Sequence, residues 1–159
     1  TLLMVSITQQ KAYLYRNGIR VGVTTVSTGK KGYETPTGVF TILQKNKDHK
    51  SNLYKDSKNN AASMPYMQRL TRHGIALHSG NWPGYPASHG CVRLSPENAA
   101  LLYALVEKTG LKNTQVLLAG STPGGEGKVE SSYRSRSHYA DSFPQRPKRG
   151  GIFRRLFGG

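Results

Sequence analysis

The chain has 159 residues, with 23 Lys and Arg against 8 Asp and Glu, and its formal net charge is +15. No apolar run approaches the roughly 20 residues that cross a bilayer, which excludes a membrane-spanning helix. The single cysteine excludes an internal disulfide and a cysteine-based metal cluster. The charge itself favours a polyanionic partner, such as nucleic acid, anionic lipid or an anionic polymer.

Strand-like patterns dominate the first 120 residues. Apolar and β-branched residues alternate with polar or small ones, as in half-buried strands. The dipeptide Asn17-Gly18 between two such runs is the strongest short-range hairpin signal. The pattern predicts strands over residues 2–8, 11–16, 19–27, 38–43, 74–78 and 114–119.

One helix is predicted after Ser95, which is a good N-cap residue. Pro96 suits the first helical position, apolar residues then recur every three or four positions, and Gly110 follows as a stop. Between residues 41 and 66 lies a long polar stretch, which predicts a surface insertion or lid. The expected fold class is therefore mainly β, with one principal helix.

The composition changes sharply at Gly120 and predicts two parts, a folded domain over 1–120 and a basic tail over 121–159. The folded part carries a net charge of +10 and the tail +5. Gly, Ser, Pro and Arg dominate the tail, so we expect it to be disordered. Its end, residues 152–159, combines apolar residues with two arginines and is either a short membrane or partner anchor or a solubilising end.

The chemically informative segment surrounds Cys91. Three of the five histidines, His73, His78 and His89, lie within 18 residues of it, and the predicted helix begins shortly after it. An adjacent imidazole or a helix N-terminus lowers the pKa of a thiol and makes it a nucleophile. A buried structural cysteine and a zinc site on the same residues are the alternatives, although the pair spacings of zinc sites are missing.

These residues resemble a known family. The sequence Ser88-His89-Gly90-Cys91, preceded by His78 and followed by Arg93, is similar to the signature of the YkuD-type L,D-transpeptidases, bacterial enzymes that cross-link peptidoglycan. Upstream, Ser27-Thr28-Gly29 and the segment 35–40 (TPTGVF) resemble the family's S-T-G and T-P-x-G-x-F segments. The resemblance covers about residues 2–119 and implies a YkuD-like mixed β fold.

The resemblance also implies roles. Cys91 is expected as nucleophile, His78 as its base, and Ser79 as the residue that orients the imidazole. The loop of His89 and Gly90 is expected to supply backbone N–H groups of Gly90 and Cys91 for an oxyanion hole. For substrate binding we expect Arg93, Ser88, Trp82 and Tyr85, with loop-building or packing roles as the alternatives.

The implied reaction is acyl transfer from a tetrapeptide stem, with release of D-alanine, to the amine of a second stem. Water as acceptor would give an L,D-carboxypeptidase, and a protein lysine an anchored lipoprotein. The resemblance implies peptidoglycan stems as partners, acylation by carbapenems, and no metal or organic cofactor.

The substrate implies a periplasmic or cell-wall location, although the sequence carries no signal segment. An anionic wall polymer or membrane surface is a further expected partner for the basic tail. Specific nucleic-acid binding is not expected, because no recognised motif is present. A non-catalytic wall-binding module remains the alternative from another functional class.

Overall fold

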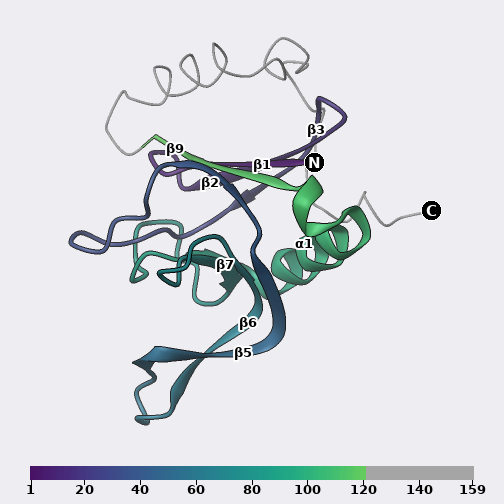
Figure 1. The fold of residues 1–159 in the computed structure, drawn as a ribbon. Coiled ribbons are helices and arrows are strands. Elements are labelled where there is room, and N and C mark those ends of the chain that lie inside the picture. The colour runs from purple at the N-terminus through teal and green to yellow at the C-terminus, as the bar shows by residue number, and fades with distance from the viewer. Residues whose placement is uncertain (121–159) are drawn as a thin grey trace.

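The structure, a computed structural model, describes residues 1–120. It contains two β-sheets and one α-helix (Figure 1). The mainly β fold class with one principal helix is thus confirmed. In chain order the elements are β1 (Leu2–Ser6), β2 (Lys11–Arg16), β3 (Ile19–Thr25), β4 (Gly38–Thr41), β5 (Gln44–Lys55), β6 (Ala61–Arg69), β7 (Ala76–Ser79), β8 (Val92–Leu94), α1 (Pro96–Thr109), the 3-10 turn η1 (Leu111–Asn113) and β9 (Gln115–Ala119).

The first sheet has the strand order β3-β2-β1-β9-β4. Its β2–β3 hairpin turns at Asn17 and Gly18, whose φ angles of 49° and 76° are both positive, as a type I′ turn requires. Strand β9 returns parallel to β1, so the end of the described chain is paired with its beginning. This sheet forms the layer at the top of Figure 1.

The second sheet has the order β5-β6-β7-β8, and α1 packs against β6 and β7. One core cluster joins both sheets and the helix. Burying each leucine or valine of that cluster contributes about 1.5–3 kcal/mol. The core against which β7 and β8 pack contains Leu3, Val5 and Leu14 of the first sheet, Leu77, Val92 and Leu94 of the second, and Leu102 and Val106 of α1.

The helix begins and ends where the sequence predicts. The side chain of Ser95 accepts a hydrogen bond from the backbone N–H of Asn98 at 3.1 Å, and Pro96 occupies the first turn. Gly110 follows the last helical residue with φ 98°, a conformation that a side chain would strain. Strand β8, which the sequence analysis missed, lies between Cys91 and this helix.

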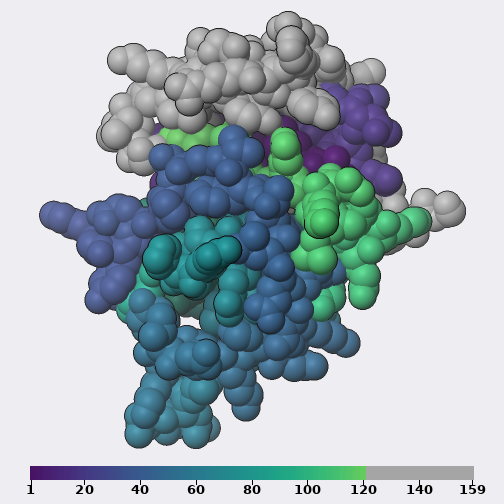
Figure 2. Space-filling model, in the orientation of Figure 1, coloured from purple at the N-terminus to yellow at the C-terminus, as the bar shows by residue number. Residues whose placement is uncertain are grey.

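The polar stretch expected as an insertion or lid forms a long antiparallel hairpin, β5 and β6. The prediction of a surface element was right in position, but its two strands were missed. The hairpin extends from the body of the molecule as an arm, at the lower end of both views (Figures 1 and 2). Most β5 side chains are exposed, and the strand is held mainly by its pairing with β6.

The predictions for residues 121–159, including the anchor-like end, lie outside the described residues. Within residues 1–120, no helix is both long enough and apolar enough to cross a membrane.

Candidate active site

Side-chain alternation on β7 and β8 places the candidate residues on one face of the second sheet. In the parallel register Leu77 pairs with Val92, and His78 pairs with Arg93. Leu77 and Val92 are fully buried in the core. Because successive residues of a strand point to opposite faces, His78 and Arg93 project from the other face. There they line a cavity of about 500 Å³ together with Cys91.

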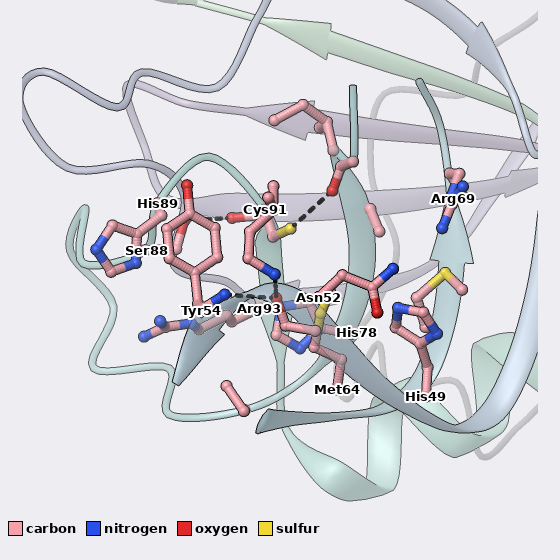
Figure 3. Close-up of a pocket in the computed structure, with 18 of the residues that line it drawn as sticks. His49, Asn52, Tyr54, Met64, Arg69, His78, Ser88, His89, Cys91 and Arg93 are labelled. Atoms are coloured by element: carbon pink, nitrogen blue, oxygen red, sulfur yellow. Dashed lines mark hydrogen bonds between the residues drawn. The ribbon is translucent and has the colours of Figure 1, made fainter. Parts of the chain in front are cut away.

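The β5–β6 hairpin forms a wall of this cavity, which gives the predicted lid a defined place (Figure 3). Other parts of the lining come from the turn between β6 and β7, the start of the β7–β8 loop, and the segment around Cys91. The lining includes His49, Asn52, Tyr54, Met64, Met67, Arg69, Arg72, His73, Gly74, Ala76, His78, Ser88, His89, Cys91 and Arg93.

Cys91 is half-buried, and its thiol donates to the backbone oxygen of Gly74 at 3.5 Å (Figure 3). Burial raises the pKa of the thiol, while the backbone N–H of Ala76 and the charge of Arg93 act in the opposite direction. The helix N-terminus expected beside the thiol is not there. Four residues of mostly extended chain, about 13 Å, separate Cys91 from the helix cap at Ser95, and the field of a helix end fades within one turn.

His78 is only 7% exposed, and its ring is held by the backbone of the next residue. Nδ1–H donates to the carbonyl oxygen of Ser79 at 2.6 Å. Because a carbonyl can only accept, this bond fixes the proton on Nδ1 and leaves Nε2 with a free lone pair. Burial lowers the pKa of His78 to about 4, and the Ser79 carbonyl opposes this effect; Arg93 and His49 lower the pKa further. His78 is therefore a neutral imidazole at pH 7, able to accept a proton.

The loop that presents Cys91 is closed by Ser88. Its hydroxyl donates to the carbonyl oxygen of Cys91 at 2.6 Å and accepts from the backbone N–H of Gly90 at 3.0 Å. The Gly90 N–H, which was expected to serve an oxyanion hole, thus donates to Ser88 in this structure. Gly90 itself has φ +121°, and an added Cβ would lie 2.7 Å from the Cδ1 atom of Ile75.

A second segment of chain supports this loop from behind. Residues 27 and 29 form isolated bridges with Arg93 and Ser88. The hydroxyl of Thr35 accepts from the backbone N–H of Gly29 at 2.8 Å and donates to the carbonyl oxygen of Gly90 at 2.7 Å. A Cβ on Gly29 would lie 1.9 Å from the Tyr33 carbonyl oxygen, so the close packing here requires glycine. The two upstream motifs of the sequence therefore act as the support of the Cys91 loop.

His89 lies in an aromatic cluster at the edge of the cavity. Its ring stacks on Tyr54 of the hairpin with centroids 4.4 Å apart, and meets Tyr33 edge-on at 4.8 Å. Burial lowers the pKa of His89, with smaller contributions from Lys30 and Arg93. The stack joins the hairpin arm to the loop that carries the thiol (Figure 3).

Other predicted site residues are placed differently. Trp82 and Tyr85 lie on the β7–β8 loop, 39% and 61% exposed, and neither is part of the cavity lining. The structure therefore does not bring these two aromatic residues to the thiol. His73 lines the cavity and is exposed. Among residues 1–120, no group of three or more His, Cys, Asp or Glu side chains is arranged to hold a metal ion.

Several lining residues were not singled out by the sequence analysis, among them His49, Tyr54, Arg69 and Arg72. His49 and Tyr54 lie within the polar stretch, whose sequence gives no indication of which side chains face inward. Arg69 ends β6 and Arg72 lies in the following turn. Only the pairing of β6 with β7 places them beside the catalytic candidates, and no local sequence signal encodes that pairing.

Comparisons with known proteins agree with this geometry. The chain matches the YkuD family, described as the L,D-transpeptidase catalytic domain, over residues 1–130. A probable L,D-transpeptidase 3 from Mycobacterium tuberculosis is 34% identical over 98 residues, which cover 54% of this chain and 36% of the relative. The chain thus spans about a third of the length of that relative.

Solved structures share the fold. An L,D-transpeptidase from Stackebrandtia nassauensis superposes with a TM-score of 0.64 at 30% identity, over 77% of this chain and 57% of that one. L,D-transpeptidase 3 of Mycobacterium tuberculosis, solved with a faropenem-derived adduct, gives a TM-score of 0.64 at 25% identity, over 74% and 59% of the two chains. The protein belongs to the L,D-transpeptidase (YkuD) family, whose catalytic domain it matches over residues 1–130.

Proposed function

We propose that this domain catalyses L,D-transpeptidation of peptidoglycan, with Cys91 as the nucleophile and His78 as the general base. The observation that carries the proposal is that a half-buried thiol and an imidazole whose Nδ1 proton is held by Ser79 line the same cavity. A base oriented in this way is the arrangement that activates a cysteine nucleophile.

In the first half-reaction the sulfur of Cys91 attacks the carbonyl carbon of the third residue of a tetrapeptide stem. Because the pKa of the thiol is raised and that of the imidazole lowered, both groups are neutral at rest. The thiol proton moves to Nε2 of His78 as the carbon–sulfur bond forms. The bond to the terminal D-alanine then breaks, and the imidazolium returns the proton to the departing amine. A thioester on Cys91 remains.

In the second half-reaction the side-chain amine of another stem attacks the thioester. His78 accepts a proton from this amine and gives it to the sulfur as the carbon–sulfur bond breaks. A new amide, the 3→3 cross-link, is formed, and the thiol is restored. The N–H of Cys91 is the amide we assign to the oxyanion, since that of Gly90 is bonded to Ser88. We assign to Arg93, whose guanidinium donates to the backbone oxygen of Asn81 at 3.5 Å and which lines the cavity, the role of binding the terminal carboxylate of the donor.

The acceptor decides which product forms on the same thioester. Water gives a tripeptide and hence L,D-carboxypeptidase activity, and a protein lysine gives an anchored lipoprotein. The opening of the cavity beside the β5–β6 hairpin is compatible with a bulky acceptor. We place the enzyme outside the cytoplasmic membrane, in the periplasm or at the wall, because the stems are found there.

The reaction is tested by incubating the protein with a purified disaccharide-tetrapeptide and measuring the products by mass spectrometry. Cross-linked dimer with release of D-alanine is the expected result. If the only product were the tripeptide, the protein would be an L,D-carboxypeptidase. Unchanged substrate, under conditions where a carbapenem still acylates the protein, would contradict the proposed donor.

A further inference from the structure

The cavity is strongly cationic. Arg69, Arg72 and Arg93 line it, and the lining contains no Asp or Glu. All five acidic residues of the described range lie elsewhere. Among residues 1–120, Arg69 and Arg72 have no carboxylate partner within ion-pair distance, and the side chain of Arg93 contacts only a backbone oxygen. Guanidinium groups without partners around one cavity favour a ligand with more than one negative charge.

The sheet register places two of these arginines on opposite sides of β7, and Cys91 directly precedes the strand that carries Arg93. Arg69 of β6 pairs with Ala76 of β7, and Arg93 of β8 pairs with His78 of β7. Neighbouring strands lie about 4.8 Å apart and the two pairings are offset by two residues along β7, so the two arginine backbones are about 12 Å apart. Figure 3 shows Arg69 and Arg93 at different ends of the cavity, with Cys91 and His78 between them. A distance of about 12 Å corresponds to about three to four residues of extended peptide.

The charges of Arg69 and Arg93 affect the pKa values of histidines that line the cavity. Arg93 lowers the pKa of both His78 and His89, and Arg69 lowers the pKa of His49. Arg69 is half-buried, so solvent screens its charge less than that of the exposed Arg72. A carboxylate bound beside Arg69 would neutralise part of the positive potential that lowers the pKa of His49.

We infer that Arg69, assisted by Arg72, binds a second free carboxylate of the acyl donor, on the acyl side of the scissile bond. The inference rests on the proposed function, in which Arg93 meets the terminal carboxylate on the leaving-group side. The second and third residues of a stem each carry a carboxylate that bacteria leave free or convert to an amide. An amide lacks the charge and replaces one of the two acceptor oxygens by an N–H donor, which a guanidinium cannot accept. The domain is therefore selective for donor stems that are not amidated.

The test measures binding to the Cys91→Ala protein, which cannot turn over its ligand. Two tetrapeptide donors are compared by calorimetry, one with free carboxylates and one amidated on its second and third residues. The free-acid donor should bind at least about tenfold more tightly, equivalent to about 1.4 kcal/mol. Arg69→Gln combined with Arg72→Gln should reduce that ratio to nearly one, and Arg69→Lys should retain part of it. Arg16→Gln, which removes the same charge on β2, should leave the ratio unchanged.

Equal affinity for the two donors in the parent protein, or a preference that survives the loss of both arginines, would overturn the inference. So would the absence of binding by either donor. Because Arg69 and Arg72 have no carboxylate partner among the described residues, their replacement should leave the melting temperature unchanged. Carbapenem acylation of a protein with Cys91 intact is measured in parallel. It reports on the proposed chemistry separately, so failure of the carboxylate preference and failure of the enzyme assignment remain distinguishable.

Discussion

The hydroxyl of Thr35 donates to the carbonyl oxygen of Gly90 at 2.7 Å, across 55 residues of sequence. Since the Thr35 hydroxyl also accepts from the N–H of Gly29, one side chain joins the two upstream motifs to the residue before the nucleophile. The position of Cys91 therefore depends on a segment that takes no part in the chemistry.

Replacing Thr35 by Val removes both hydrogen bonds and keeps the side-chain shape. It leaves a buried N–H and a buried carbonyl oxygen unsatisfied, which costs about 1–3 kcal/mol for each orphaned group. We expect a lower free energy of unfolding in urea and slower carbapenem acylation. Thr37→Val, two residues along at an exposed position, is the matched control and should change neither. Acylation at the parent rate in the Thr35 variant would show that the loop holds its position without this bond.

Replacing Gly90 by Ala should displace the loop, because the added Cβ would lie 2.7 Å from Cδ1 of Ile75 at a φ of +121°. We expect acylation to fall by about 100-fold or more, since small misplacements of a reacting group cost that much. Ile75→Val removes the clashing atom. The double variant should therefore recover part of the rate, while the strained φ keeps it below the parent. If the double variant were acylated no faster than Gly90→Ala, the whole loss of rate would come from the strained backbone at Gly90.

The buried His78 should make the domain sensitive to acid. Its pKa is lowered from 6.5 to about 4, mainly by burial, so between these values the unfolded chain binds a proton that the folded domain does not. The free energy of unfolding should therefore fall as the pH decreases from about 6.5 to about 4, by up to about 3 kcal/mol from this group. Urea unfolding at several pH values measures this slope. His78→Gln should reduce the slope, and His73→Gln at an exposed position should not.

Gln68 is fully buried on β6, and neither its side-chain oxygen nor its nitrogen has a hydrogen-bond partner among the described residues. Its neighbours Met67 and Arg69 face the cavity, so its side chain points to the opposite face. Gln68→Met keeps the length and removes the unsatisfied amide, and should raise the free energy of unfolding by about 1 kcal/mol or more. Gln115→Met at an exposed position is the control. A destabilised Gln68 variant would reveal a buried water bound to the amide.

Local signals predicted much of this fold and site. The Asn17-Gly18 turn, the Ser95 cap and the Gly110 stop depend on neighbouring residues, and the structure has each where the sequence indicates. The cluster of His78 and Cys91 was visible because a short loop joins two adjacent strands.

What the sequence could not predict depends on contacts between distant segments. The β5 strand has no apolar alternation, because it lies at the edge of its sheet and is mostly exposed. The inward position of Arg69 follows from its register with β7, which its neighbours in sequence do not encode. The prediction that a helix N-terminus activates Cys91 was wrong, because the extended strand β8 lies between Cys91 and the helix.

The central claim, that Cys91 is the nucleophile of this domain, is tested most directly by intact-mass measurement after incubation with a carbapenem, followed by peptide mapping. The account predicts one covalent adduct per chain, located on Cys91, and none on Cys91→Ala, the variant that lacks the thiol. An adduct that persists on Cys91→Ala, or a parent protein that forms none, would contradict it.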